Sequence, residues 1–105
     1  MPTRLVALGA GPDICVDRTV VLVGRDPRCD VRLDSWRVSR IHCCLAPERD
    51  GIVVRDLAST NGTWINGRRV VTGRLRAGDE LAIAHHRYRL EAERTPEVMP
   101  LSRCG

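Results

Sequence analysis

The sequence contains no lysine and no phenylalanine, and it has only one tyrosine and two tryptophans. With so few aromatic residues, the core has to be built from Val, Leu and Ile, and the β-branched residues of this set favour strands over helices. Few aromatic side chains also means few stacking platforms for bases, which argues against a nucleic-acid binder. All 17 basic residues are arginines, and a guanidinium can bind an anion through two parallel hydrogen bonds, whereas an ammonium cannot.

Long apolar runs and paired cysteine motifs are also missing. No stretch approaches the roughly 20 apolar residues of a membrane span, so we expect no membrane partner. No signal peptide and no C-x-x-C motif is evident, and we therefore expect a reduced, cytoplasmic chain whose cysteines act as small hydrophobic residues and bind no metal. The arginine-only, Gly-, Ala- and Val-rich composition hints at a bacterial source. The cysteines are odd in number: Cys15, Cys29, Cys43, Cys44 and Cys104.

The overall charge is mildly basic. The net charge is +4 and the isoelectric point is near 9.1, which suits an acidic or phosphorylated partner. The arginines are spread along the chain and partly balanced by 13 acidic residues, so we expect no general nucleic-acid binding. A chain of 105 residues is one domain, which buries roughly 60–70% of the surface of its unfolded state.

Short apolar runs with turn residues every six to twelve positions dominate the chain, and no helical periodicity is convincing. They predict an all-β, two-sheet sandwich of about eleven strands. Asn66-Gly67 is a strong signal for a two-residue hairpin turn. The pattern stops at Arg94, so we expect a domain over residues 1–93 and a flexible tail over 94–105. The strand segments are Thr3–Leu8, Ile14–Val16, Thr19–Val23, Asp30–Leu33, Ile41–Ala46, Ile52–Leu57, Trp64-Ile65, Arg68–Val71, Glu80–Ala84 and Arg87–Glu93.

Two polar clusters flank the central pair of predicted strands. Ser39-Arg40 precedes Ile41–Ala46, and Ser59–Asn61 follows Ile52–Leu57. The turn-rich segment Pro47–Gly51 joins the two strands as an antiparallel hairpin, which brings both clusters to the same end of the sheet. Hydroxyl, guanidinium and amide groups would meet there on loops held by a rigid scaffold. This arrangement indicates a binding site for an anion that is attached to an extended chain.

An ordered set of motifs carries a family resemblance. The chain resembles the forkhead-associated (FHA) domain over about residues 3–93. This resemblance implies an FHA/SMAD-like sandwich that binds phosphothreonine peptides through loops at one end, without catalysis or a cofactor. It also implies a role in signalling, with a phosphorylated kinase or kinase substrate as partner and a monomeric domain. The motifs are Gly24-Arg25, Ser39-Arg40-x-His42, Ser59-Thr60-Asn61-Gly62-Thr63, Asn66-Gly67 and Gly78-Asp79.

Five residues are candidates for contacts to the peptide. Arg25 leaves a strand and could form charge-assisted bonds to phosphate oxygens, and Arg40 supplies a second charge. Ser39 offers a hydroxyl donor, and its alternative role is to form a turn. Arg40 could equally be a surface arginine in an ion pair. Thr60 and Asn61 lie in a Gly-containing loop, where the asparagine amide suits a peptide backbone and the alternative is turn chemistry alone.

Other residues in the same loops have supporting or open roles. His42 resembles the family's structural histidine, which supports the binding loops by hydrogen bonding, and Gly24 and Gly62 are assigned to the same support. Arg28 and Arg37 either assist binding or are solvated. Trp36 and Arg37 make the loop before Val38 bulkier than the family pattern, so the resemblance does not imply which residues are preferred beside the phosphothreonine.

Two competing functions need consideration. A scaffold of the same fold could bind a partner through a sheet face without phosphate. An enzyme would need a nucleophile and a base, for which Cys43 beside His42 is the one candidate, but neighbours in a strand point to opposite faces. His85-His86 offers too few ligands for a metal. We therefore expect an interaction module and no enzyme.

Overall fold

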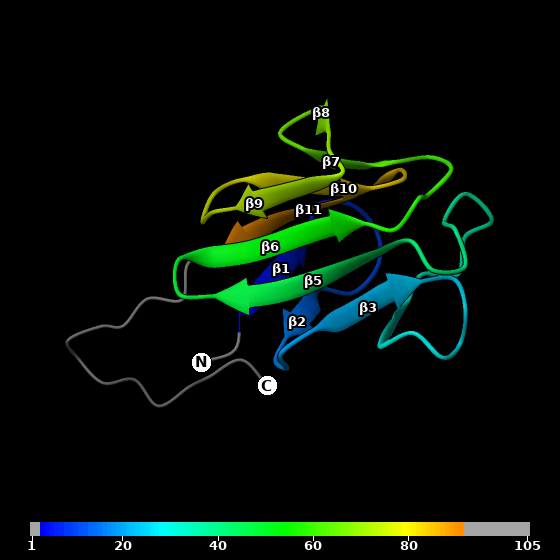
Figure 1. The fold of residues 1–105 in the computed structure, drawn as a ribbon, viewed down its shortest axis with the longest axis horizontal. Coiled ribbons are helices and arrows are strands. Elements are labelled where there is room, and N and C mark those ends of the chain that lie inside the picture. The colour runs from blue at the N-terminus through cyan, green and yellow to red at the C-terminus, as the bar shows by residue number, and fades with distance from the viewer. Residues whose placement is uncertain (1–2, 92–105) are drawn as a thin grey trace.

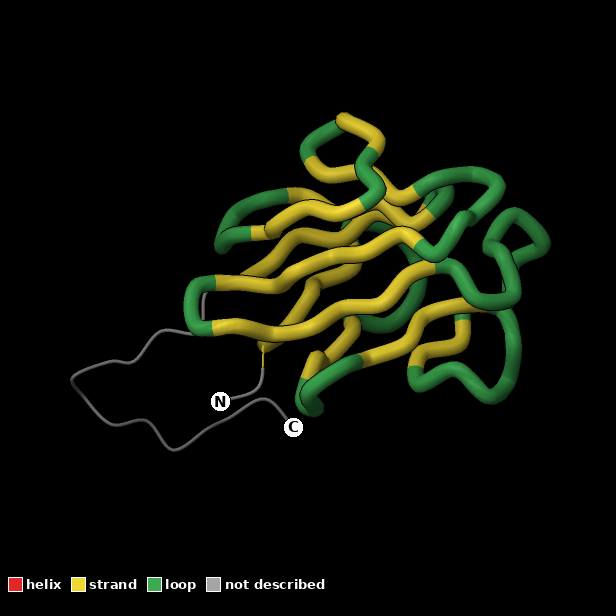
Figure 2. The backbone as a smooth tube through the Cα atoms, in the orientation of Figure 1, coloured by secondary structure: helices red, strands yellow, loops and turns green. Residues whose placement is uncertain are grey.

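The computed structural model describes residues 3–91. Within this range the regular elements are eleven strands, with no helix, and they form two sheets that face each other (Figure 1, Figure 2). The predicted all-β sandwich is therefore confirmed. The predicted tail, residues 94–105, lies outside the described residues.

The two sheets contain six and five strands, and all strand pairs are antiparallel except β3 with β4. The six-stranded sheet has, in spatial order, β2 (Ile14–Val16), β1 (Thr3–Ala7), β11 (His86–Glu91), β10 (Glu80–Ile83), β7 (Thr63–Ile65) and β8 (Arg68–Arg69). The five-stranded sheet has β4 (Val31–Arg32), β3 (Val21–Gly24), β5 (Cys43–Glu48), β6 (Gly51–Asp56) and β9 (Thr72–Leu75).

The core lies between the sheets and follows from the two-residue period of the strands. In β6, Ile52 and Val54 are fully buried, while Arg55 is exposed; in β11, Tyr88 and Leu90 are buried between exposed residues. Tyr88 is the one aromatic residue in the buried cluster of the described chain. The aliphatic core expected from the composition is thus present, and each fully buried Val, Leu or Ile contributes about 1.5–3 kcal/mol.

The β5–β6 hairpin has a tighter turn than the sequence predicted. Pro47 pairs with Ile52 inside the ladder, and the turn is Arg49-Asp50 rather than Pro47–Gly51. A proline is tolerated here because the pairing of β5 with β3 ends at Leu45, so the missing N–H of Pro47 lies beyond that ladder. The two strands are consequently longer than predicted at the turn end.

Strand β9 was missed by the sequence analysis. Thr72–Leu75 has one large apolar residue and a glycine, and the predicted strand Arg68–Val71 is shortened to two residues. The glycine is required by packing, because a Cβ on Gly73 would lie 2.8 Å from Cδ1 of Ile65. A glycine inside a strand therefore marks a close approach between the two sheets here.

The Asn66-Gly67 turn is confirmed as a two-residue hairpin turn. Both residues have positive φ, 50° and 83°, as a type I′ turn requires. The Asn66 side chain also binds the turn before β10: its Nδ2 donates to Asp79 Oδ1 at 3.1 Å, and its Oδ1 accepts from the Glu80 N–H at 2.9 Å. The Asn66 side chain thus ties the β7–β8 turn to the connection between β9 and β10.

We expect Asn66→Ala to lower the free energy of unfolding by about 1–2 kcal/mol, because it loses both bonds and adds backbone strain. Thermal unfolding measures this loss. Asn66→Gly removes the same bonds without strain and should lose less. Equal losses in the two variants would show that the backbone conformation contributes nothing.

Candidate functional site

Loops from both predicted polar clusters meet at one end of the sandwich, where β3 and β6 end and β5 begins (Figure 1). They enclose a hollow of about 380 Å³. All five candidate contact residues line it, so the structure brings together the groups that the sequence analysis selected. The lining residues are Arg25, Trp36, Arg37, Val38, Ser39, Arg40, Thr60 and Asn61.

Gly24 allows the first loop to pass directly against the second. A Cβ at this position would collide with the carbonyl oxygen of Arg40. The close approach lets the Arg25 N–H donate to Ser39 O at 3.0 Å. The Arg25 side chain is also held, because its Nε donates to Val38 O at 2.9 Å. Its guanidinium is thereby fixed at the hollow, and its two terminal nitrogens have no hydrogen bond within residues 3–91.

Ser39 occupies the centre of the contacts between the loops. Its backbone N–H donates to Nδ1 of His42 at 3.0 Å, and its Oγ accepts from the Thr60 N–H at 3.1 Å. Since the hydroxyl oxygen is used as an acceptor, the hydroxyl proton remains to be donated to a ligand. Ser39 therefore joins the two loops, and its hydroxyl proton is not used in either of these bonds.

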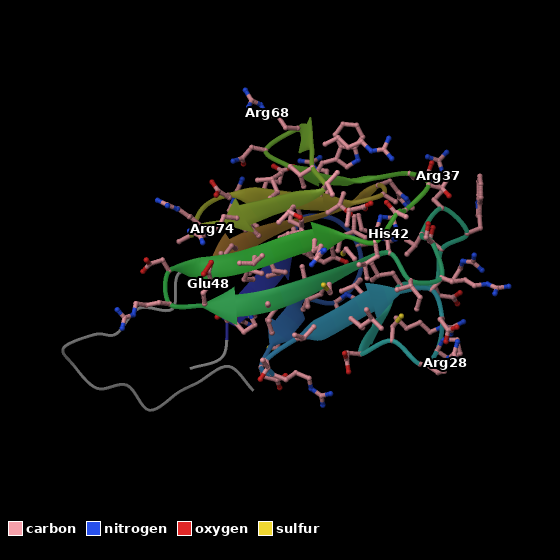
Figure 3. The ribbon with its side chains drawn as sticks, viewed as in Figure 1. Arg28, Arg37, His42, Glu48, Arg68 and Arg74 are labelled. Carbon is pink, nitrogen blue, oxygen red and sulfur yellow. The ribbon has the colours of Figure 1, made fainter. Side chains whose placement is uncertain are left out.

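His42 is buried, with 0% exposure, and lies in the sandwich next to the same two loops (Figure 3). Nδ1 accepts from Ser39, and Nε2 lies 2.8 Å from Gly62 O. A neutral ring with its proton on Nε2 makes both bonds. Through these two bonds the ring links the loop of Ser39 to the loop of Gly62.

Asn61 is fixed by its neighbours but keeps polar groups for a ligand. Its side-chain Nδ2 donates to Arg37 O at 2.7 Å, and its backbone carbonyl oxygen accepts from Trp64 Nε1 at 3.3 Å. The side-chain oxygen and the second N–H of Nδ2 have no hydrogen bond within the described residues. Gly62 follows with φ of 87°, and a Cβ there would lie 2.8 Å from Arg69 Nε.

The hollow is strongly positive. Arg25, Arg37 and Arg40 line it, and no acidic residue does. Neither Arg37 nor Arg40 takes part in an ion pair with the part of the chain that the structure describes. Figure 3 shows Arg37 at this end of the molecule, whereas the ion pair of Glu48 with Arg74 lies towards the opposite end. Such unpaired guanidiniums attract an anion and bind it by charge-assisted hydrogen bonds.

The comparison with known families agrees with this geometry. The family model described as FHA domain matches residues 21–84, which includes every residue placed at the hollow. The chain belongs to the FHA domain family.

Curated relatives of this FHA domain include bacterial regulators. The glycogen accumulation regulator GarA of Mycobacterium tuberculosis is 36% identical over 78 residues, which are 74% of this chain and 48% of GarA. The oxoglutarate dehydrogenase inhibitor of Corynebacterium diphtheriae is 35% identical over 78 residues, 74% of this chain and 54% of the inhibitor. The chain thus spans about half the length of these relatives.

Solved FHA structures share the fold. One is Mycobacterium tuberculosis EmbR in complex with a low-affinity phosphopeptide, with 26% identity and a TM-score of 0.79 over 86% of this chain and 24% of EmbR. Another is the N-terminal FHA domain of S. cerevisiae Rad53p in complex with a phosphothreonine peptide. It has 25% identity and a TM-score of 0.72 over 87% of this chain and 93% of that domain.

Asp56 supports the second loop of this FHA domain, a role that the sequence analysis missed. Its carboxylate accepts from the Ser59 N–H at 3.0 Å and from Thr63 Oγ1 at 2.7 Å, and also from Ser59 Oγ. Ser59 Oγ in turn accepts from the Gly62 N–H at 3.1 Å. Partial burial alone would raise the pKa of Asp56, but the hydrogen bonds from Ser59 and Thr63 outweigh it, so the pKa is lowered.

We expect Asp56→Ala to lower the free energy of unfolding by about 2 kcal/mol near pH 7, because three donors lose their acceptor. The loss should depend on pH. A carboxyl group whose pKa is lowered on folding stabilises the protein above its ordinary pKa of 3.8, and this contribution disappears as the pH falls through the lower, folded value. Chemical unfolding from pH 7 to pH 2.5 should show the two proteins converging in acid, and a constant difference would contradict the assignment.

Arg28 is occupied by an acidic neighbour. Its Nε and Nη2 each lie 3.0 Å from an oxygen of Asp26, one nitrogen to each oxygen. The hydrogen bonds from Arg28 lower the pKa of Asp26 to about 2. Arg28 does not line the hollow. The Arg28 guanidinium is hydrogen-bonded to the carboxylate of Asp26. Of the two additional arginines considered from the sequence, Arg37 lines the hollow.

The structure offers two further observations on the alternative functions. No group of three or more His, Cys, Asp or Glu side chains in residues 3–91 is arranged to hold a metal ion. His85 and His86 lie with ring centroids 4.3 Å apart, and no third ligand joins them. Over the same described range, no helix has the length and apolarity needed to cross a membrane.

Proposed function

We propose that this FHA domain, residues 1–93, is a phosphothreonine-dependent interaction module. The observation that supports this function best is the hollow itself: three arginines, a hydroxyl and an amide converge on loops held by a buried histidine. The peptide complexes of the related FHA structures point in the same direction. The proposed partner is a phosphorylated kinase or kinase substrate, bound by a monomeric domain in the cytoplasm.

Each candidate residue has a distinct part in the proposed binding. Arg25 and Arg40 bind phosphate oxygens, and the free proton of Ser39 adds a third donor. The Asn61 amide pairs with the peptide backbone, and the exposed Thr60 lies beside it. Because the loops are already linked by hydrogen bonds, binding requires little ordering of the site, which favours affinity.

The alternative of an enzyme has little physical support. Cys43 is fully buried, and burial raises the pKa of its thiol to about 12. Such a group stays protonated and is a poor nucleophile at neutral pH. Its neighbour His42 already uses both ring nitrogens in holding the loops. A phosphate-independent scaffold remains as the second candidate, and a peptide titration separates it from the proposed function.

We expect a phosphothreonine peptide to bind at least about 100-fold more tightly than the same peptide with threonine, because two charged contacts depend on the phosphate. The second pKa of the phosphate is about 6, so affinity should fall between about pH 7.5 and pH 5 as the dianion is lost, while the arginines stay charged. Isothermal titration of both peptides at several pH values measures this. Equal affinities at pH 7.5 would favour the phosphate-independent scaffold.

A further inference from the structure

Trp36 is the large apolar side chain that the described chain exposes most, with 81% of its surface accessible. The next most exposed, Val71, lies in the β8–β9 connection, outside the hollow. Trp36 in contrast lines the hollow beside Arg25 and Arg40. The other tryptophan, Trp64, is half-buried and donates its indole N–H to Asn61 O. An exposed indole next to a binding site is an unusual feature that the proposed phosphate contacts leave unexplained.

The backbone on both sides of Trp36 is held by hydrogen bonds. The Val38 N–H donates to Ser35 O at 3.0 Å, and the Arg37 N–H donates to Ser35 Oγ at 3.3 Å. Asn61 holds the same turn through Arg37 O, and the Arg37 guanidinium lies 5.4 Å from the centre of the Trp36 ring. The indole is thus presented by an ordered turn. A ligand that covers it needs little additional ordering of the protein.

From this placement we infer that Trp36 determines selectivity, by binding an apolar side chain close to the phosphothreonine in the same peptide. The inference rests on the proposed function, because the peptide has to be anchored at Arg25 for its neighbouring residue to reach the indole. The partner class is therefore a phosphothreonine segment with an aliphatic or aromatic residue near the modified threonine.

The charges of the hollow and the removal of the Trp36 indole from water both favour an apolar peptide side chain over a charged one at this position. A basic residue would be repelled by Arg25, Arg37 and Arg40. An acidic residue could pair with Arg37, but that guanidinium is exposed, and exposed ion pairs change affinity by less than about fivefold. Covering the indole with an apolar side chain removes a large aromatic surface from water, and tryptophan is common among the residues that dominate interfaces for this reason.

The test uses synthetic phosphothreonine peptides with alanine on both sides, in which a single leucine is moved through three positions before and three after the phosphothreonine. At one position we expect leucine to raise the affinity about tenfold. Tryptophan emission should shift to the blue on binding, as the indole loses water. In Trp36→Ala, both the affinity gain from leucine and the blue shift should disappear. Trp36→Phe should keep part of the affinity gain. Val71→Ala removes an exposed apolar residue elsewhere and should keep both effects.

The outcomes distinguish this inference from the proposed function. Equal affinity for phosphothreonine and threonine peptides refutes the proposed function, and the inference with it. Phosphate-dependent binding that leucine improves at no position refutes the inference alone, as does a leucine preference that survives in Trp36→Ala. An aspartate scan supplies the last comparison: a stronger gain from aspartate that disappears in Arg37→Ala would assign selectivity to the charge and overturn the apolar assignment.

Discussion

Replacing Arg25 with alanine should weaken phosphothreonine-peptide binding by about 30- to 150-fold, equivalent to about 2–3 kcal/mol, the value of a hydrogen-bonded charge in a binding site. The structure supports this size of effect because Nε of Arg25 is held by Val38 O and the terminal nitrogens face the hollow without another partner in the described chain. Isothermal titration with one phosphothreonine peptide measures the change.

Two further variants make the result specific. Arg25→Lys retains the charge but cannot form the two parallel hydrogen bonds of a guanidinium. Its affinity should therefore lie between that of Arg25→Ala and that of the parent. Arg74→Ala removes the same charge at the other end of the sandwich, where Arg74 pairs with Glu48 at 3.0 Å (Figure 3), and its affinity should match that of the parent. If Arg25→Ala bound as well as the parent, or if both alanine variants lost affinity equally, Arg25 would not be the phosphate contact.

The site was largely predictable because its groups lie in short, recognisable motifs. Ser39 lies in the loop before β5 and Asn61 in the loop after β6. An antiparallel hairpin places two such loops at the same end of the sheet irrespective of where its turn begins. The wrong prediction of the turn, Pro47–Gly51 instead of Arg49-Asp50, therefore did not change the position of the site. The hairpin at Asn66-Gly67 was predictable for a similar reason, since its turn chemistry is entirely local.

The residues that were missed act through contacts that no local pattern reports. Asp56 accepts from Thr63 across seven positions. The contact of Asp56 with Thr63 exists only once β6 and β7 have their places in different sheets. The one local signal was the spacing of Asp56 and Ser59, which is typical of an aspartate that caps a turn. Strand β9 gave no apolar pattern because its Gly73 is required by packing against Ile65.

His42→Ala should have the largest effect on stability, lowering the free energy of unfolding by about 3–5 kcal/mol. The ring is fully buried, so its removal leaves a cavity. It also leaves the Ser39 N–H without its acceptor and removes one of the two donors to the Gly62 carbonyl, which keeps its bond from the Ala84 N–H. Because these two groups belong to the two binding loops, we expect the remaining folded protein to bind a phosphothreonine peptide at least about tenfold more weakly.

The comparison that isolates this second effect is Val54→Ala. Val54 is equally buried but lies in β6, among aliphatic core residues, so its truncation should cost about 2–3 kcal/mol in stability through lost packing alone. Its folded fraction should bind with the affinity of the parent, because the loops keep their hydrogen bonds. Denaturant unfolding gives the folded fraction of each variant, and a titration corrected for that fraction gives the affinity. Were both variants to bind normally after this correction, His42 would stabilise the core without positioning Ser39 and Gly62 for the ligand.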